Sequence, residues 1–350
     1  MPPLIRRLVR QLKLIYLWIT RILFARNRFR VPLPIRLWYA VFGGFVGDQY
    51  VLYNLRSRNT GQYLSEFDWY RSRWINEPFD PMLNNKIVCN ETLAPHTRVP
   101  QIYYIRNRGR LVSYHAPESH NEVDDVLRFL RIRGAAFLKP IGSGKGKGVH
   151  RIDAVRSGWL VDARPVPESK VRDLLSSMDG WFLSEAMEQH PEVAAIFPET
   201  TNTARIITLR DPETGIPEVF FAVLRIGAAS TIPVDNGSRG GLVARIDLNT
   251  GALSEARSLW STESHTHHPD SGNPIKGTIL PGWSKTRDAV VDLTHKFPYL
   301  QIIAWDILLT DSGFCVIEAN TSTGVNIIQI WGGQRNGTLG NFFRAHGVIT

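Results

Sequence analysis

Two β-rich runs joined by a short glycine-containing turn constrain this chain most, because they carry carboxylates where a buried strand pair usually has none. The runs cover residues 302–310 and 314–320, and the Asp-Ser-Gly between them has the composition of a hairpin turn. A hairpin centred on this turn places Asp306 opposite Glu318, with Cβ atoms roughly 5 Å apart. Two like charges among Trp, Ile, Leu and Val side chains repel each other and lose hydration unless a cation lies between them.

A third oxygen donor extends this pair. Asn320 lies two residues beyond Glu318 and therefore on the same face of its strand. Asp306, Glu318 and Asn320 together predict a Mg²⁺ site, because Mg²⁺ prefers hard oxygen ligands and keeps open positions for phosphate oxygens. A carboxyl pair that shares one proton, or a register shift that separates the two carboxylates, is the alternative.

A glycine-rich loop between two predicted strands is the second informative feature. It runs from Gly142 to Gly148, and its glycines allow backbone N–H groups to approach phosphates while Lys145 and Lys147 add positive charge. The residues after the loop have a strand pattern, so it is neither a Walker loop nor a dinucleotide fingerprint. Lys139, in the apolar strand before the loop, needs an anionic partner, which argues against a flexible turn without a ligand.

Together these motifs resemble the ATP-grasp superfamily, and they follow the order of that family from about Met82 to Asn326. The resemblance implies an α+β fold, the ATP-grasp fold, in which two α+β subdomains sandwich ATP, preceded here by an N-terminal helical region. It also implies that the protein uses ATP with Mg²⁺, two ions being held by the Asp…Glu-x-Asn set. The nucleotide-binding residues that it implies are Lys86, Lys139, Ser143, Lys145, Gly146, Lys147, Gly148, Glu185, Met187 and Glu188.

The second half of the chain resembles the α-L-glutamate ligase branch, in which arginines and an Asn-rich Gly-Gly turn hold the transferred phosphoryl group and the acyl acceptor. The segments at 268–272 and 281–283 are similar to a sugar-transfer-associated family of this branch that is found with polysaccharide genes. Each arginine taken alone could equally be a surface residue. The resemblance implies catalytic roles for Arg205, Arg225 and Arg239, and substrate contacts by Asn202, Asn236, His268 and Asp270.

The function that this resemblance implies is an ATP-dependent carboxylate–amine ligase, which forms an amide through an acyl phosphate. We expect small-molecule or saccharide carboxylates and amines as its partners, with an amino acid joined to a sugar or uronic acid in surface polysaccharide biosynthesis. An ATP-grasp kinase, which would use the same ATP and metal residues, is one alternative. A non-catalytic, membrane-associated scaffold for polysaccharide assembly is the other, although the complete Lys, Gly-loop and Asp/Glu/Asn set argues against it.

The N-terminus is basic and amphipathic. Nine Lys or Arg residues and no acidic residue precede residue 40, and apolar residues recur among them at helical spacing. The longest uncharged apolar stretch, between Lys13 and Arg21, is far shorter than the roughly 20 residues that span a bilayer. We therefore expect residues 1–30 to lie on an anionic membrane surface or, as the alternative, to pack as an amphipathic helix on the protein's own core. The basic run has no recognised nucleic-acid-binding motif, so no nucleic acid is expected as a partner.

Composition favours a cytoplasmic enzyme that can be peripheral on the inner face of the cell membrane. The chain has 350 residues, of which 43% are hydrophobic, and only two cysteines, so it can bury a large core without a disulfide framework. We expect four regions along the chain: a basic helical segment at 1–45, a mixed α/β region at 46–125, a small lid subdomain at 126–190 and a core subdomain with the metal site at 191–350.

Overall fold

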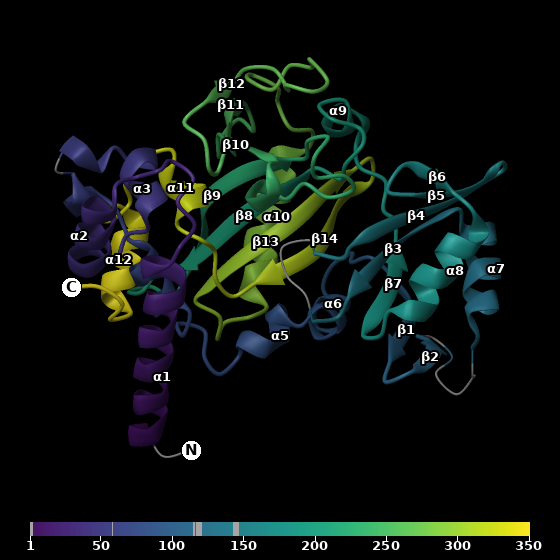
Figure 1. Cartoon of the computed structure of the whole chain (residues 1–350), viewed down its shortest axis with the longest axis horizontal. Coiled ribbons are helices and arrows are strands. Elements are labelled where there is room, and N and C mark those ends of the chain that lie inside the picture. Colours follow the sequence, from purple (N-terminus) through teal and green to yellow (C-terminus); the bar gives the residue numbers. More distant parts are fainter. Residues whose placement is uncertain (1–2, 58, 115, 117–120, 143–146) are drawn as a thin grey trace.

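The chain folds around two antiparallel sheets of seven strands each, as its computed structural model shows (Figure 1). The structure describes the whole chain except residues 1–2, 58, 115, 117–120 and 143–146. The sheet of β8 to β14, which has the longer strands and is called the larger sheet, forms the centre of the molecule (Figure 1). The sheet of β1 to β7, called the smaller sheet, lies at one end, and the N-terminal helices lie at the other (Figure 1). This combination of helices with separate antiparallel sheets confirms the predicted α+β class.

The smaller sheet has the strand order β2-β1-β7-β3-β4-β5-β6. Its strands are β1 (Ile102–Asn107), β2 (Arg110–Ser113), β3 (Ala135–Pro140), β4 (His150–Val155), β5 (Gly158–Val161), β6 (Arg164–Val166) and β7 (Trp181–Glu185). Helices α7 (Val123–Arg133) and α8 (Glu168–Ser177) pack on it and bury Leu130 and Leu175 with Leu138. Because β1 pairs with β7, the sheet takes in two strands that precede the predicted lid at 126–190. A pairing between strands so far apart in the chain leaves no local sequence signal.

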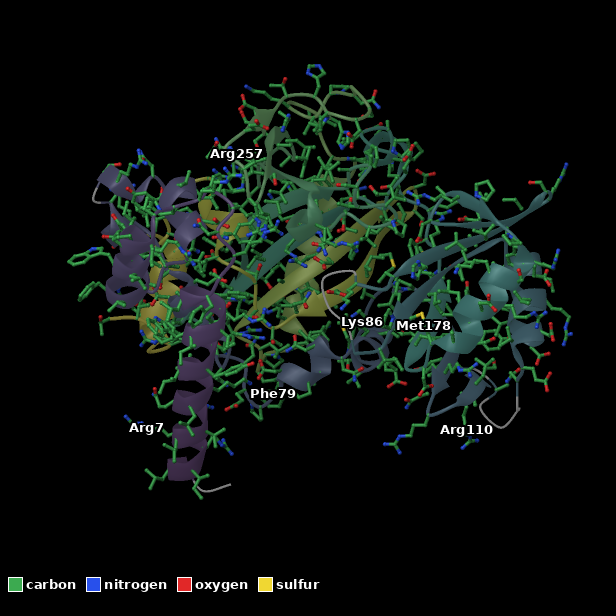
Figure 2. All side chains as sticks on the ribbon, viewed as in Figure 1. Arg7, Phe79, Lys86, Arg110, Met178 and Arg257 are labelled. Carbon is green, nitrogen blue, oxygen red and sulfur yellow. The ribbon has the colours of Figure 1, made fainter. Side chains whose placement is uncertain are left out.

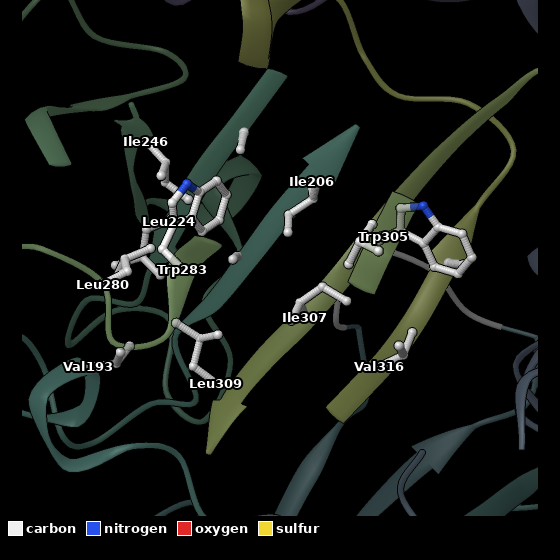
Figure 3. Close-up of a cluster of buried hydrophobic side chains, with 14 of the residues drawn as sticks. Val193, Ile206, Leu224, Ile246, Leu280, Trp283, Trp305, Ile307, Leu309 and Val316 are labelled. Carbon is white, nitrogen blue, oxygen red and sulfur yellow. The ribbon is translucent and has the colours of Figure 1, made fainter. Parts of the chain in front are cut away.

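The larger sheet has the order β12-β11-β10-β9-β8-β13-β14. Its strands are β8 (Thr203–Arg210), β9 (Pro217–Ile226), β10 (Leu242–Ile246), β11 (Leu253–Ser258), β12 (Ser264–His265), β13 (Ile302–Thr310) and β14 (Gly313–Asn320). One face packs against α10 (Trp283–His295), where Trp283, Ile206 and Trp305 belong to one buried cluster (Figure 3). On the other face, α11 (Asn326–Gln329) and α12 (Thr338–Ala345) contribute Ile328 and Phe343 to a second cluster. The short helix α9 (Pro191–Ala194) precedes β8.

Successive side chains of a strand point to opposite faces of the sheet, and this decides which residues of the central strands share a face. Ile206 and Trp305 point into the core beneath α10. Arg205 and Asp306 are their neighbours in sequence and therefore point to the opposite side of the sheet. The charged residues of the candidate site thus lie on the face that α10 leaves uncovered.

The predicted hairpin at residues 302–320 is present, but its turn differs from the expected one. Its two strands are joined by two residues rather than three, since Thr310 pairs with Gly313. A β-bulge beyond Asp306 then shifts the register, so that Asp306 still pairs with Glu318. The predicted opposition of the two carboxylates is confirmed, through a tight turn plus a bulge.

The first hundred residues form short helices. They are α1 (Pro3–Leu17), the π-helix η1 (Trp18–Leu23), α2 (Leu33–Gly43), α3 (Gly47–Leu52), the 3-10 turns η2 (Leu55–Ser57) and η3 (Thr60–Gln62), α4 (Glu66–Ser72), α5 (Asp80–Asn84) and α6 (Lys86–Leu93). Gln49 of α3 donates a hydrogen bond of 2.9 Å to Asn326 of α11, whereas α1 extends away from the body (Figure 1). Within the part of the chain that the structure describes, no helix has the length and apolar character needed to cross a bilayer.

Helices α5 and α6 are fastened to the end of β14. Asn84 donates to the hydroxyl of Thr321 at 3.0 Å, and that hydroxyl donates to Asp80 at 3.0 Å. Asn85 caps α6 by accepting hydrogen bonds from the first N–H groups of that helix. These bonds hold Lys86, the first residue of α6, where the two sheets come together (Figure 2).

Candidate active site

A buried ion network on β8, β9 and β13 forms the centre of the candidate site. Arg205 pairs with Asp306 across the two strands and donates two hydrogen bonds to its carboxylate, from Nε to Oδ1 at 2.8 Å and from Nη2 to Oδ2 at 2.7 Å. Arg225 of β9 donates a third, from Nη1 to Oδ2 at 2.9 Å. Burial by itself would raise the pKa of Asp306, but the two guanidiniums outweigh it and hold this pKa below its ordinary value. Asp306 is therefore an ionised anchor for two arginines.

Asp235 closes this network on the far side of Arg225, and the sequence pattern does not single it out. It accepts hydrogen bonds from Nη2 of Arg225 and from the backbone N–H of Thr203, the latter at 2.9 Å. Burial would lower the pKa of Arg225, but Asp235 and Asp306 outweigh it and raise this pKa above its ordinary value. Arg225 is thus a permanent cation held between two carboxylates. The one local signal for Asp235 is its place directly before an Asn-Gly turn.

These arginines change the physical argument for a metal. The opposition of Asp306 and Glu318 calls for a cation, and on the Asp306 side two guanidiniums provide it. Asn320 and Glu318 are half-buried, and Nδ2 of Asn320 donates to Oε1 of Glu318 at 3.1 Å. Among the described residues, none donates a hydrogen bond to Oε2 of Glu318 or to Oδ1 of Asn320. The half of the predicted set on β14 therefore presents the more accessible oxygen atoms.

The donor set fits Mg²⁺, because its atoms are carboxylate and amide oxygens without thiolate or imidazole. In the described part of the chain, no group of three or more His, Cys, Asp or Glu side chains is placed to hold a metal ion. An ion at the hairpin would therefore depend mainly on Glu318, on Asn320 and on oxygens from outside the protein, because Asp306 already accepts three hydrogen bonds from arginines. That composition is expected of a metal bound together with phosphate.

Two charged groups from different elements, Glu318 and Lys86, act on Lys139. Burial lowers the pKa of Lys139, on β3, to about 8; the negative charge of Glu318 opposes this shift and the positive charge of Lys86 adds to it. Lys139 is thus within electrostatic reach of both groups, although the three come from β3, α6 and β14. Lys139 also lies over the ring of Phe137, with its Nζ 5.4 Å from the ring centroid. Glu318 therefore supplies part of the negative charge that a buried lysine such as Lys139 needs nearby.

The glycine-rich loop connects β3 to β4, as expected, and Ser143, Lys145 and Gly146 lie outside the described residues. Lys147 is exposed, and Gly148 has a φ of +73°, in the left-handed region that favours glycine. A Cβ at Gly148 would lie 3.1 Å from Cγ of Pro140 at the end of β3. The two ends of the loop therefore approach each other closely. The roles of its residues in nucleotide binding stay predictions.

The segment after β7, which we predict to contact the nucleotide, is partly engaged within the protein. Glu185 accepts a hydrogen bond of 2.6 Å from Arg98 and another of 3.1 Å from the backbone N–H of Gln101. Met187 contacts the same arginine through its sulfur at 3.4 Å. Met187 and Glu188 line an open pocket of about 340 Å³ together with residues of β4 and of the segment before β8. This pocket lies where the smaller and larger sheets meet.

The hydrogen bonds of three predicted substrate contacts favour a structural role. The buried amide of Asn202 donates to two backbone carbonyls and accepts from a hydroxyl and a backbone N–H. Two backbone N–H groups donate to Nδ1 of His268, so Nε2 carries the proton and donates to the carbonyl of Gly227 at 2.8 Å. Asp270 accepts from the N–H of Ala229 at 2.8 Å. The histidine and asparagine thus have their hydrogen-bonding capacity used by the chain itself.

Asn236 and Arg239 lie in the turn between β9 and β10, which contains the 3-10 turn η4 (Gly237–Arg239). The carbonyl of Asn236 accepts from the N–H of Arg239 at 3.0 Å and from that of Gly241 at 3.2 Å. A Cβ at Gly241 would lie 2.9 Å from a backbone oxygen of β9, so glycine is required there. The turn follows directly after Asp235, and its role in substrate binding stays a prediction.

Solved structures similar to this chain include three enzymes, each with low sequence identity. The ATP-grasp ligase PsnB, complexed with a phosphomimetic variant of its minimal precursor, Mg and ADP, is 14% identical, with a TM-score of 0.42 over 85% of this chain and 72% of that chain. D-cycloserine synthetase DcsG is 12% identical, with a TM-score of 0.40 over 86% of this chain and 80% of that chain. N5-carboxyaminoimidazole ribonucleotide synthetase from Thermotoga maritima is 13% identical, with a TM-score of 0.37 over 82% of this chain. The chain spans only 54% of that synthetase. No curated protein matches the chain.

The family comparison covers most of the molecule. The profile described as sugar-transfer associated ATP-grasp matches residues 68–338. This range begins within α4 and ends at the first residue of α12, so it contains both sheets, Lys86, Lys139 and the carboxylate hairpin. It confirms the resemblance that the sequence motifs indicate. The chain therefore belongs to the sugar-transfer-associated ATP-grasp family.

Proposed function

We propose that this protein is an ATP-dependent carboxylate–amine ligase that forms an amide, with a saccharide carrying the carboxylate or the amine. Membership of the sugar-transfer-associated ATP-grasp family supports the use of ATP and the saccharide class. The observation that carries the proposal is the placement of Glu318 on the sheet face that also holds Arg205 and Arg225, within electrostatic reach of Lys139. One face thus combines cations for phosphates, oxygen ligands for Mg²⁺ and fixed guanidiniums.

The nucleotide would bind where the two sheets meet. Lys86 and Lys139 would contact its phosphates, and N–H groups of the glycine-rich loop would add donors. Glu318 and Asn320, beside the predicted third ligand Asp306, would hold Mg²⁺, and the ion would offset the charge of the phosphates. The chain's own task at this end of the site is to place the γ-phosphoryl group next to the arginines.

The reaction would proceed in two steps. An oxygen of the substrate carboxylate attacks the γ-phosphorus, the bond from that phosphorus to the bridging oxygen breaks, and ADP leaves an acyl phosphate behind. The amine then attacks the acyl carbon, loses a proton to the solvent and displaces inorganic phosphate. Arg205 and Arg225 would stabilise the developing oxyanions, since Asp306 and Asp235 hold both guanidiniums in place before substrate binds. Arg239, on the exposed turn, would contact the substrate.

The compartment that suits this chemistry is the cytoplasm, where ATP and Mg²⁺ are available. Both cysteines are free and buried, which agrees with a reducing compartment. The saccharide would belong to a lipid-linked or growing surface polysaccharide.

Mass spectrometry after incubation with ATP, Mg²⁺, uronic acids or amino sugars, and amino acids tests the proposal. We expect a product with the mass of acid plus amine less one water, and ADP and phosphate released in equal amounts. Hydroxylamine added in place of the amine should yield a hydroxamate, because it captures an acyl phosphate. A stable phosphorylated saccharide formed without any amine would instead identify a kinase, and failure to bind ATP would identify a scaffold.

A further inference from the structure

The apolar side of α1 does not pack on the protein. At about 100° per residue, its apolar residues occupy an arc of roughly 140°. The seven members of this arc, which are 47% to 79% exposed, are Leu4, Ile5, Leu8, Val9, Leu12, Ile15 and Tyr16. Leu14, on the other side of the helix, is 8% exposed and packs in a cluster with Ile22 and Ala40. The segment therefore rests on the core near Leu14, and the apolar arc stays outside that contact.

Helix α2 carries a second exposed apolar face that the sequence pattern does not single out. Its members recur at helical spacing and are Leu33, Leu37, Trp38, Val41 and Phe42, each at least 41% exposed. The rings of Trp38 and Phe42 contact each other, with centroids 4.4 Å apart. Both helices lie at the end of the molecule opposite the smaller sheet (Figure 1). Exposed aromatic side chains of this kind suit the boundary between lipid head groups and acyl chains.

The charged residues of α1 and α2 themselves are all basic. No acidic residue precedes Asp48, and Arg7 projects from α1 into solvent (Figure 2). Arg10 pairs with Glu77 and Arg28 with Asp48, whereas the other Lys and Arg residues of this stretch form no salt bridge with described residues. On α1, Arg6 and Lys13 flank one edge of the apolar arc and Arg7 lies beyond the other. A second copy of the chain docked on this surface would bring like charges together, whereas an anionic bilayer would neutralise them.

We propose that α1 and α2 together form a docking surface for a bilayer with anionic lipids, with the apolar arc of α1 and the Trp38–Phe42 face of α2 entering its interface. This placement deepens the proposed function, since it would bring the ligase to a lipid-linked saccharide. The surface itself is independent of catalysis. Its charge supplies long-range attraction and its apolar side chains supply the insertion.

Vesicle binding measured without ATP or saccharide tests whether the basic residues of α1 attract the protein to anionic lipid. The full chain should co-float with vesicles of phosphatidylcholine and 30% phosphatidylserine, and binding to pure phosphatidylcholine should be far weaker. The triple variant Arg6→Gln, Lys13→Gln and Arg7→Gln should bind about 100-fold more weakly, at roughly fivefold for each charge lost. Its matched control removes three exposed lysines elsewhere, Lys170→Gln, Lys285→Gln and Lys296→Gln, and should bind as the wild type does. Equal binding to neutral and anionic vesicles, or equal losses in both triple variants, would overturn the proposal.

Two further variants test whether the apolar side chains of α1 and α2 enter the bilayer interface. Leu8→Glu with Leu12→Glu should reduce binding at least tenfold, and Trp38→Ser with Phe42→Ser about fivefold. Ile132→Glu changes an apolar side chain that is 85% exposed on α7, and should leave binding unchanged.

Circular dichroism melts equal to the wild type would show that these exposed positions do not hold the fold. Unchanged binding in the α2 variant would remove α2 from the surface, and a dimer in solution that Leu8→Glu and Leu12→Glu convert to a monomer would assign the face to a second copy. A catalytically inactive Glu318→Gln protein should bind vesicles normally, so failure of the ligase proposal leaves this test intact.

Discussion

Asp306 on β13 and Glu318 on β14 are paired in one hairpin and lie on one face of the sheet, yet their surroundings differ. Asp306 is 3% exposed and accepts three hydrogen bonds from two arginines. Glu318 is half-buried, takes one hydrogen bond from Asn320 and lies within electrostatic reach of Lys139. One strand of the hairpin therefore faces the protein's own cations, and the other faces the space where ligand would bind.

The difference between the surroundings of Asp306 and Glu318 shows how a sheet can hold two opposed carboxylates, since arginines offset the charge of one of them. The charge of Asp306 is balanced inside the protein, so its removal would leave Arg205 without this counter-charge and Arg225 with Asp235 alone. The carboxylate of Glu318 forms no salt bridge with described residues, so a metal ion could still be accommodated there. The four predictions that follow test this contrast between a structural Asp306 and a ligand-binding Glu318, from the largest expected effect to the smallest.

Glu318→Gln should reduce turnover at least about 10³-fold while changing the free energy of unfolding by about 0.5 kcal/mol or less, because it removes a ligand charge at constant volume. Phosphate release and urea unfolding measure the two effects. A variant that unfolds much more easily than the wild type would place Glu318 among the structural charges, and the contrast with Asp306 would disappear.

Asp306→Asn should destabilise the fold by about 3 kcal/mol, because Arg205 and Arg225 would lose a buried counter-charge. Urea unfolding measures this loss. The matched control is Asp311→Asn in the turn of the same hairpin, whose side chain is 77% exposed, and it should change stability by about 0.5 kcal/mol or less. Similar stabilities of the two variants would mean that the arginine pairs do not hold β13.

Lys139→Met should weaken binding of a non-hydrolysable ATP analogue about 30-fold, since it removes a cation beside the phosphates and keeps the apolar stem. Calorimetry measures the affinity, with the exposed Lys170→Met as control. If both variants bind the analogue alike, Lys139 belongs to the lid core and not to the nucleotide site.

Asp235→Asn should have the smallest effect, about 1 to 2 kcal/mol in stability and about tenfold in turnover, because Arg225 keeps its bond to Asp306. Initial rates at varied saccharide concentration separate positioning from binding. A fall in kcat with unchanged KM is expected if Arg225 acts in the transition state. Full activity with reduced stability would restrict Asp235 to a structural role.

Local sequence patterns predict part of this arrangement. The hairpin and the strand–loop–strand around Lys139 follow from alternation and turn composition. The pairing of Asp306 with Glu318 is predicted correctly, but it also depends on a β-bulge that the sequence does not reveal. The bond from Arg205 to Asp306 does not, because the two residues are about a hundred positions apart and meet only when β8 and β13 pair.

Loop composition alone does not decide the role of a polar side chain. His268 and Asn202 are polar residues in glycine- and proline-containing segments, which is typical of binding loops, but the loops use these side chains to satisfy their own backbone groups. Asp235 is missed for the converse reason, since its partners lie on β8 and β9 and its neighbours in sequence form an ordinary turn.

The central claim is that the β14 half of the hairpin holds the metal while the β13 half anchors arginines. Electron paramagnetic resonance of Mn²⁺ bound in the presence of ADP measures this most directly, because Mn²⁺ substitutes for Mg²⁺ at oxygen sites. We predict that the folded Glu318→Gln protein binds Mn²⁺·ADP at least about 30-fold more weakly than the wild type, and that Asp311→Asn binds it equally well. Wild-type Mn²⁺ affinity in Glu318→Gln would contradict the account.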